Sequence, residues 1–258
     1  YFLIFTLELG ISGAAIASSL AEMGSLIVLC IYTKAKIDKD KYGLKPVYDG
    51  RLLIKVLNLS VWSMLHAFIS VAPWFLFFVA IEHLGKTELA ISNITRSVSA
   101  IFFVIANSFA VTTGSLVSNA IGARARNELF PICHKVLKLG YAVGIPFVVV
   151  ALLCNRWIVS FYTDNELLIE LAFAPFVVML LNYTFALPGY VYLNAVGGTG
   201  KTKITFLFQV TTTCVYLVYL YWLSFCIKAS LSLYLTAEYL FVILLALQSI
   251  IYLKSKHY

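Results

Sequence analysis

Charged residues are scarce in this chain of 258 residues: Asp, Glu, Lys and Arg make up 12% of it, whereas hydrophobic residues make up 61%. Soluble domains carry about 25% charged and about 45–50% apolar residues. A water-soluble fold of this length has no use for so much apolar surface, so a soluble protein is excluded. The few charges also cluster and leave long uncharged runs, which is typical of a polytopic membrane protein.

Cysteine is sparse too, and the five cysteines are scattered, odd in number and without a C-x-x-C pair. This spacing favours neither a metal site nor a disulfide framework, so we interpret them as small apolar packing residues. The chain begins at Tyr1 inside an apolar stretch, with no Met and no signal-peptide pattern before it. We therefore interpret it as a fragment of a longer protein.

Clusters of catalytic side chains are missing as well. The four histidines stand in no H-x-x-x-x-D or H-E-x-x-H pattern, and the aspartates occur only between apolar segments. These patterns indicate neither a metal-dependent nor a Ser/His/Asp active site. We expect no catalytic residue and no metal ligand, and we predict that the chain is not an enzyme.

What the sequence does have is long apolar segments. A helix that crosses about 30 Å of hydrocarbon needs about 20 mostly apolar residues. Seven segments qualify, at about 11–33, 56–81, 89–121, 136–154, 168–196, 204–227 and 231–253. They are too long for the alternating strands of a membrane barrel. The predicted fold class is an all-α polytopic membrane protein with seven transmembrane helices, several of them kinked by proline.

Lysine and arginine predict the orientation of these helices. Fifteen of the 19 cations lie in one alternating set of connections, around 34–55, 124–138, 201–203 and the C-terminus. The positive-inside rule places that set in the cytoplasm, with Tyr1 outside and Tyr258 inside. This bias accounts for the net charge of +7, so no nucleic-acid partner is expected. We expect an integral protein of a bacterial inner membrane, in contact with the lipid bilayer.

The stretch NAVGGTGKTK at 194–203 comes close to the phosphate-binding pattern G-x-x-x-x-G-K-T, but Ala195 stands where the first Gly belongs. Residues 171–200 carry no charge and include two prolines, as in a membrane helix, and no acidic strand follows to hold magnesium. We therefore predict a tight turn between two helices, formed by Gly197, Gly198 and Gly200 and anchored at the cytoplasmic face by nearby lysines.

This turn resembles one in the multidrug and toxic compound extrusion (MATE) transporters, an L-R-G-x-G-D-T-K-like sequence between their tenth and eleventh helices. Here VGGTGKTK at 196–203 has Gly197 in the Arg place and Lys201 in the Asp place. LGISGAAIAS at 9–18 is similar to the family's G-x-x-G-A-A-x-A-T entry to helix six. LVSNAIGA at 116–123 is similar to its L-V-G-Q-x-x-G-A exit from helix eight.

The resemblance covers the whole chain and implies its organisation. Residues 1–33 would be the last helix of the N-terminal lobe, and 34–55 a cytoplasmic linker between the lobes, part of which could lie on the membrane surface as an amphipathic helix. Residues 56–258 would be the six-helix C-terminal lobe of a 6+6 transporter whose first five helices are missing here.

The resemblance also implies a function. The family exports organic cations or amphipathic compounds, including drugs, in exchange for Na+ or H+, and needs no other cofactor. The implied partners are the missing N-terminal lobe and a small organic substrate. A lipid-linked oligosaccharide flippase of related fold is the alternative. Some members bind their cation with carboxylates in helices seven and ten, but residues 56–81 and 171–196 contain none, so that scheme does not carry over.

Three charges lie well inside spans, where each is costly and so a candidate for function. Glu22, with serines on its face, is a proton or cation site, a contact between lobes, or a hydrogen-bonded carboxyl that holds helices together. Arg96 shares a face with Ser92, Asn107 and Ser118 at 100° per residue. We expect this stripe to face a cavity, where Arg96 attracts an anionic group or pairs with a carboxylate of the other lobe.

A structural ion pair within this lobe is the other interpretation of Arg96, and Glu238 in the last span is either its partner or a contact for a substrate cation. Weaker pathway candidates are the polar and aromatic side chains of the second, third and fifth spans. They are His66, Asn107, Asn182, Tyr183, Tyr190 and Asn194. Aromatic rings beside amides suit organic cations through cation–π contact, although ordinary helix packing uses the same residues.

Overall fold

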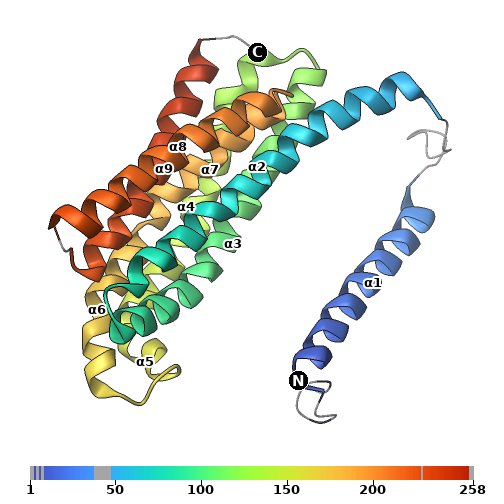
Figure 1. The fold of residues 1–258 in the computed structure, drawn as a ribbon. Coiled ribbons are helices and arrows are strands. Elements are labelled where there is room, and N and C mark those ends of the chain that lie inside the picture. The colour runs from blue at the N-terminus through green and yellow to red at the C-terminus, as the bar shows by residue number, and fades with distance from the viewer. Residues whose placement is uncertain (1–2, 4–5, 7–8, 38–47, 228, 256–258) are drawn as a thin grey trace. The chain divides into compact units, whose positions relative to one another are not determined.

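The computed structural model describes residues 3, 6, 9–37, 48–227 and 229–255 and is helical almost throughout (Figure 1). Within these residues there is no β-strand, and seven helical segments are long and apolar enough to cross a membrane. The predicted all-α fold with seven transmembrane helices is confirmed. The chain divides into two compact units, residues 1–53 and 54–258, and each is described by itself.

The first unit contains helix α1, Gly10–Lys36. Lys34 and Lys36 occupy its last turn, where cations interact favourably with the carbonyl end of a helix.

Helix α2 begins at Gly50, earlier than the predicted residue 56, because the Asp49 carboxylate accepts hydrogen bonds from the N–H groups of Arg51 and Leu52 at 2.9 and 3.2 Å. Residues 38–47 of the predicted linker and Lys256, His257 and Tyr258 lie outside the described residues.

The second unit is a helical bundle (Figure 1). Its segments in chain order are α2 (Gly50–Glu82), α3 (Lys86–Gly122), η2 (Arg126–Glu128), α4 (Leu129–Leu153), α5 (Asn155–Ser160), α6 (Glu166–Leu181), α7 (Tyr183–Gly198), α8 (Thr202–Trp222), η3 (Leu223–Ile227) and α9 (Leu231–Lys254). Six of the seven candidate spans belong to it, with α6 and α7 forming one span together. Helix α4 starts before the predicted residue 136, so Lys135 and Lys138 are helical.

Helix α7 is the central element of this bundle. It packs against α3, α4, α8 and α9, and most of its side chains are buried. Small residues allow this close packing, which is how membrane helices associate in the absence of a hydrophobic driving force. A Cβ added to Gly189 would lie 2.7 Å from the carbonyl oxygen of Val242 on α9, so α7 and α9 touch through backbone at this point.

The fifth span is broken at Asn182, where a single helix over 168–196 was predicted. Pro188 has no N–H to donate to the Thr184 carbonyl four residues before it. That carbonyl instead accepts a hydrogen bond of 2.7 Å from the Tyr141 hydroxyl on α4. A neighbouring helix therefore satisfies the backbone group that the proline leaves free, as a proline inside a membrane span requires.

The predicted glycine turn between two helices is confirmed. Helix α7 ends at Gly198 and α8 begins at Thr202, with Gly200 between them at φ +82°, a conformation that side chains rarely adopt. In the described residues this segment follows a helix and no strand precedes it, so the setting of a phosphate-binding loop is missing.

Two of the three stretches singled out in the sequence meet at this turn. The Ser118 hydroxyl on α3 donates a hydrogen bond of 2.9 Å to the Gly198 carbonyl. A Cβ on Gly198 would lie 2.5 Å from the carbonyl oxygen of Gly114, so the end of α7 rests on α3 with no room for a side chain. The segments 116–123 and 196–203 together fix the end of the lobe that we predict to be cytoplasmic.

Candidate functional site

Arg96 and Glu238 form a buried ion pair between α3 and α9. Arg96 Nη2 donates to Glu238 Oε1 at 2.6 Å, and the two side chains are 2% and 13% exposed. The Tyr216 hydroxyl on α8 donates to the same carboxylate oxygen at 3.3 Å. Three helices that are distant in sequence are therefore joined at one carboxylate. Of the two interpretations of Arg96, this geometry is that of an ion pair within the lobe.

Helix α2 surrounds the Arg96 guanidinium with aromatic rings. The guanidinium carbon lies 3.9 Å from the centroid of the Phe77 ring, 5.0 Å from that of Trp74 and 5.4 Å from that of Phe78. Rings at these distances attract a cation through their negative faces. They offset part of the cost of burying the charge, and they attach α2 to α3.

The predicted polar stripe on α3 divides into two environments. Ser92 and Arg96 are buried inside the lobe, so the expectation that these two face a cavity was wrong. Asn107 and Ser118 are exposed. The reason is that α3 is 37 residues long and has different neighbours along its length. Side chains of α2 and α9 cover it at Arg96, and the end of α7 contacts it at Ser118.

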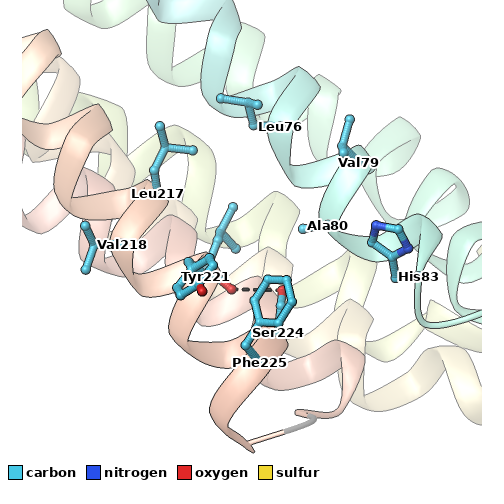
Figure 2. Close-up of a pocket in the computed structure, with 10 residues that line it drawn as sticks. Leu76, Val79, Ala80, His83, Leu217, Val218, Tyr221, Ser224 and Phe225 are labelled. Carbon is cyan, nitrogen blue, oxygen red and sulfur yellow. Dashed lines mark hydrogen bonds between the residues drawn. The ribbon is translucent and has the colours of Figure 1, made fainter.

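An apolar groove of about 680 Å³ lies between α2 and α8. Figure 2 shows Leu76, Val79 and Ala80 on α2 facing Leu217, Tyr221 and Phe225 across it. Polar atoms are few: His83 stands at the end of α2, and the Ser224 hydroxyl donates to the Leu220 carbonyl at 2.9 Å. Ligand pockets measure about 300–1,000 Å³ and are mostly apolar, so an amphipathic molecule of drug size would fit here.

A smaller and more polar pocket, of about 410 Å³, lies where the two sequence motifs meet. Side chains of α2, α3, α7 and α8 line it: Ser63, His66, Val111, Ser115, Ser118, Leu193, Asn194, Thr202 and Thr205, with Gly114, Gly197 and Gly198. His66 and Asn194, two of the predicted pathway residues, are thus brought together. Asn194 Nδ2 donates to the Tyr190 carbonyl at 3.0 Å, and no described residue bonds to His66 Nε2. We call this the His66 pocket.

The other predicted residues of the fifth span pack inside the lobe. Tyr183 is 3% exposed, covers Gly144 on α4, and donates through its hydroxyl to the Gly140 carbonyl at 2.8 Å. Asn182 is buried at the break between α6 and α7. Tyr190 is partly buried, with its ring 5.6 Å from that of Phe103. Helix packing accounts for these contacts, and a role of these residues in transport stays a prediction.

Glu22 lies in α1, in the first unit, and its side chain is exposed there. Ser18, predicted to share its face, donates its hydroxyl to the Ala14 carbonyl at 3.1 Å. The pathway role proposed for Glu22 stays a prediction. Among the residues that the structure describes, no group of three or more His, Cys, Asp or Glu side chains is placed to hold a metal ion.

Sequence reasoning missed the residues that surround Arg96. Tyr216, Phe77 and Trp74 look like ordinary lipid-facing or packing aromatics when the sequence is read alone. The available signal was the cost of burying an arginine charge in a membrane span, which predicts a carboxylate partner. Because α2 is rich in aromatic residues, it also predicts aromatic rings stacked against the guanidinium. Of the serines in the His66 pocket, Ser118 was part of the predicted polar stripe, whereas Ser63 and Ser115 gave no signal, since single hydroxyls are common in membrane helices.

Six membrane-spanning segments, with the broken α6–α7 span at their centre, pack together and leave an apolar groove and a polar pocket between them. The chain superposes on an outward-facing MATE family transporter of the MOP superfamily with a TM-score of 0.84 at 18% identity, covering 99% of this chain and 58% of that one. A MATE protein in complex with MaL6 gives 0.83 at 18% identity with the same coverage of both chains.

A MOP superfamily transporter from Pyrococcus furiosus gives a TM-score of 0.64 at 17% identity, covering 76% of this chain and 43% of that one. The family model described as MatE matches residues 63–223, more than half of the sequence, so the chain belongs to the MatE family of transporters. No curated protein matches it. The chain spans 58% of the length of each of the first two solved structures.

Proposed function

We propose that the chain is the C-terminal lobe and the preceding helix of a secondary active transporter, which exports organic cations or amphipathic compounds in exchange for Na+ or H+. The observation that carries this proposal is the six-span lobe itself, whose fold and family model agree over residues 63–223. Transport would proceed by alternating access, with this lobe rocking against the N-terminal lobe that the longer relatives possess.

The apolar groove between α2 and α8 supports an amphipathic substrate. Its lining is largely aliphatic, with the rings of Tyr221 and Phe225 at one side and the imidazole of His83 at one end (Figure 2). Such a surface takes up an apolar body by burial and leaves a polar end near water. In this proposal the groove binds part of the substrate, and the missing lobe supplies the other wall.

Glu22 and Glu238 remain the proposed carboxylates of the ion pathway. Both hydrogen bonds to Glu238 go to Oε1, and its side chain keeps 13% of its surface exposed, so the carboxylate is open on one side.

The flippase alternative calls for a cavity lined by several cations. Arg96, the cation well inside a described span, is buried and paired, so the described residues give the flippase no support.

The test uses the full-length protein in proteoliposomes. We expect ethidium transport that depends on an imposed H+ or Na+ gradient, and no movement of a fluorescent lipid-linked oligosaccharide. Glu22→Gln and Arg96→Ala should lower ethidium transport without preventing membrane insertion, whereas Glu166→Gln, at an exposed ion pair, should leave it unchanged. Oligosaccharide movement without ethidium transport would replace the proposal by the flippase alternative, and wild-type transport in both variants would remove Glu22 and Arg96 from the mechanism.

A further inference from the structure

The His66 pocket lies apart from the ion pair and the apolar groove, and it joins four helices at the end of the lobe that carries the glycine turn. Its lining is rich in hydroxyl groups, with one amide and one imidazole. A pocket of about 410 Å³ with this lining has room and hydrogen-bonding partners for several water molecules, since a single water needs about 10–15 Å³ and two to four polar partners.

His66 is the titratable side chain among the residues that line this pocket. Its Nε2 atom is buried and has no hydrogen-bond partner among the described residues. Leaving a buried polar nitrogen without a partner is unfavourable, so this atom needs either a water molecule or a proton with an acceptor for it. Hydrogen-bond acceptors line the same pocket. The Asn194 amide donates through Nδ2, which leaves its Oδ1 free to accept, and Ser115 and Ser118 add hydroxyl oxygens.

The charged groups near this pocket determine which ion it suits. No carboxylate lines it, and α3 between residues 97 and 122 and α7 carry no charged side chain. Helix α8 brings Lys201 and Lys203, and the Lys203 ammonium lies 5.2 Å from the ring of Trp62, one turn before His66 on α2. A Na+ ion bound here would have no carboxylate to balance its charge, whereas an imidazole can itself take up a proton.

From this arrangement we propose that the His66 pocket is a proton-binding site, with His66 Nε2 as the acceptor, and that H+ is the ion exchanged for substrate. The proposal rests on the transport function proposed above. In the protonated imidazole both ring nitrogens carry a hydrogen, so Nε2 donates toward Asn194 Oδ1, Ser118 or a pocket water. Protonation thereby ties α2 to α3 and α7 at the end of the lobe that must open and close.

Loss of the proton leaves α2 without this link to α3 and α7, while the rings around Arg96 hold its other half and Trp62 keeps its contact with α8. Because α2 has the smallest buried share of the candidate membrane spans of this unit, it is suited to move between two positions. The proton therefore biases one of two arrangements of α2, which is what coupling requires: a ligand shifts an equilibrium only by binding its two states differently.

The experiment uses full-length protein in proteoliposomes with imposed gradients. An outwardly or inwardly directed pH gradient should drive ethidium transport by the wild type, a Na+ gradient alone should not, and His66→Gln should abolish the pH-driven transport. His134→Gln is the matched control, because His134 is exposed on α4 and bonds the Phe130 carbonyl. Transport driven by Na+ alone, or pH-driven transport by H66Q at the wild-type rate, would overturn the proposal.

A second measurement does not depend on transport. In detergent-purified protein with labelled histidine, the NMR signal that disappears in H66Q should move as the pH is varied over the range in which the protein stays folded, and it should shift when ethidium is added. If the wild type transports ethidium under neither gradient, the proposed function fails, and the titration alone decides the site. A His66 signal that stays constant over this pH range would rule out proton binding, whether or not H66Q folds.

Discussion

Arg96 on α3 and Glu238 on α9 are 142 positions apart in sequence and 2.6 Å apart at their nearest charged atoms. Arg96 is almost completely withdrawn from water, Glu238 keeps 13% of its side chain exposed, and α2 covers the guanidinium with the rings of Trp74 and Phe77. Every helix that meets at this point contributes either a charge, a hydroxyl or an aromatic face, and α2, α3, α8 and α9 are held together there.

Breaking this pair should destabilise the lobe strongly. In Glu238→Gln the arginine keeps its charge and loses its counter-ion inside the bundle, which costs about 3–5 kcal/mol for buried pairs. We expect a clear drop in the midpoint of thermal unfolding of the detergent-purified full-length protein. Glu166→Gln is the control, since the Arg156–Glu166 pair is 72% and 73% exposed and such pairs contribute about 0–1 kcal/mol.

A double substitution separates the effect of the two charges on stability from the effect of the volume that the two side chains occupy. Arg96→Met with Glu238→Leu leaves no buried charge, and apolar replacements of this size are often neutral or stabilising. The double variant should therefore be more stable than E238Q. A midpoint for E238Q as high as that of the Glu166→Gln control would contradict the account of the pair.

The glycine turn gives a prediction that compares two adjacent residues. Gly198→Ala places a Cβ against the Gly114 carbonyl oxygen, where backbone must shift, whereas a Cβ on Gly197 meets only the Thr205 methyl group at an ordinary 3.7 Å. We expect G198A to cost about 1–3 kcal/mol through overpacking, and G197A to be nearly neutral. The amount of protein that elutes as a single species after membrane extraction, together with its unfolding midpoint, checks this.

Ser118→Ala should have an intermediate effect in the same assays. It removes one hydrogen bond to the Gly198 carbonyl, with a typical net contribution of about 1 kcal/mol. Equal stability of G197A and G198A would mean that α7 and α3 do not touch at this point.

Gly144 and Tyr183 make a second contact of this kind. A Cβ on Gly144 would overlap the Tyr183 ring, whose hydroxyl bonds the Gly140 carbonyl. Gly144→Ala should push the ring away from α4, lose that hydrogen bond and lower the unfolding midpoint. Gly122→Ala, at the end of α3 with nothing within 4 Å, serves as the control. Combining G144A with Tyr183→Ala should cost less than the sum of the two single changes, because the overlap is then gone.

The helices of this protein could be predicted from its sequence because hydrocarbon thickness sets their length and composition. All seven predicted spans are present, and the main differences lie at their ends. Helix α2 starts before the predicted residue because Asp49 caps it. Helix α4 starts at Leu129 because helical hydrogen bonds continue beyond the apolar stretch from which the span was predicted. The hydroxyl of Tyr141 on α4, which satisfies the Thr184 carbonyl that Pro188 leaves free, is a contact that no local pattern contains.

The sites were harder to predict because they depend on which helix faces which. Periodicity placed Arg96 and Ser118 on one face of α3, yet different neighbours cover the two residues. The sequence left open whether Glu238 or the missing lobe neutralises Arg96, and only packing decides between them. His66 looks like an isolated buried histidine in the sequence, and only packing shows that three other helices bring hydroxyl and amide groups to its pocket.

The membrane topology of this lobe is the claim on which the functional account depends, and labelling of single cysteines tests it most directly. In full-length protein with all native cysteines replaced, Tyr48→Cys, Lys201→Cys and Asp164→Cys each place one thiol at an exposed position. We expect an impermeant maleimide to label D164C in intact spheroplasts, and to label Y48C and K201C only after permeabilisation. Labelling that puts Y48C and K201C on opposite sides of the membrane would contradict the topology and the transporter lobe with it.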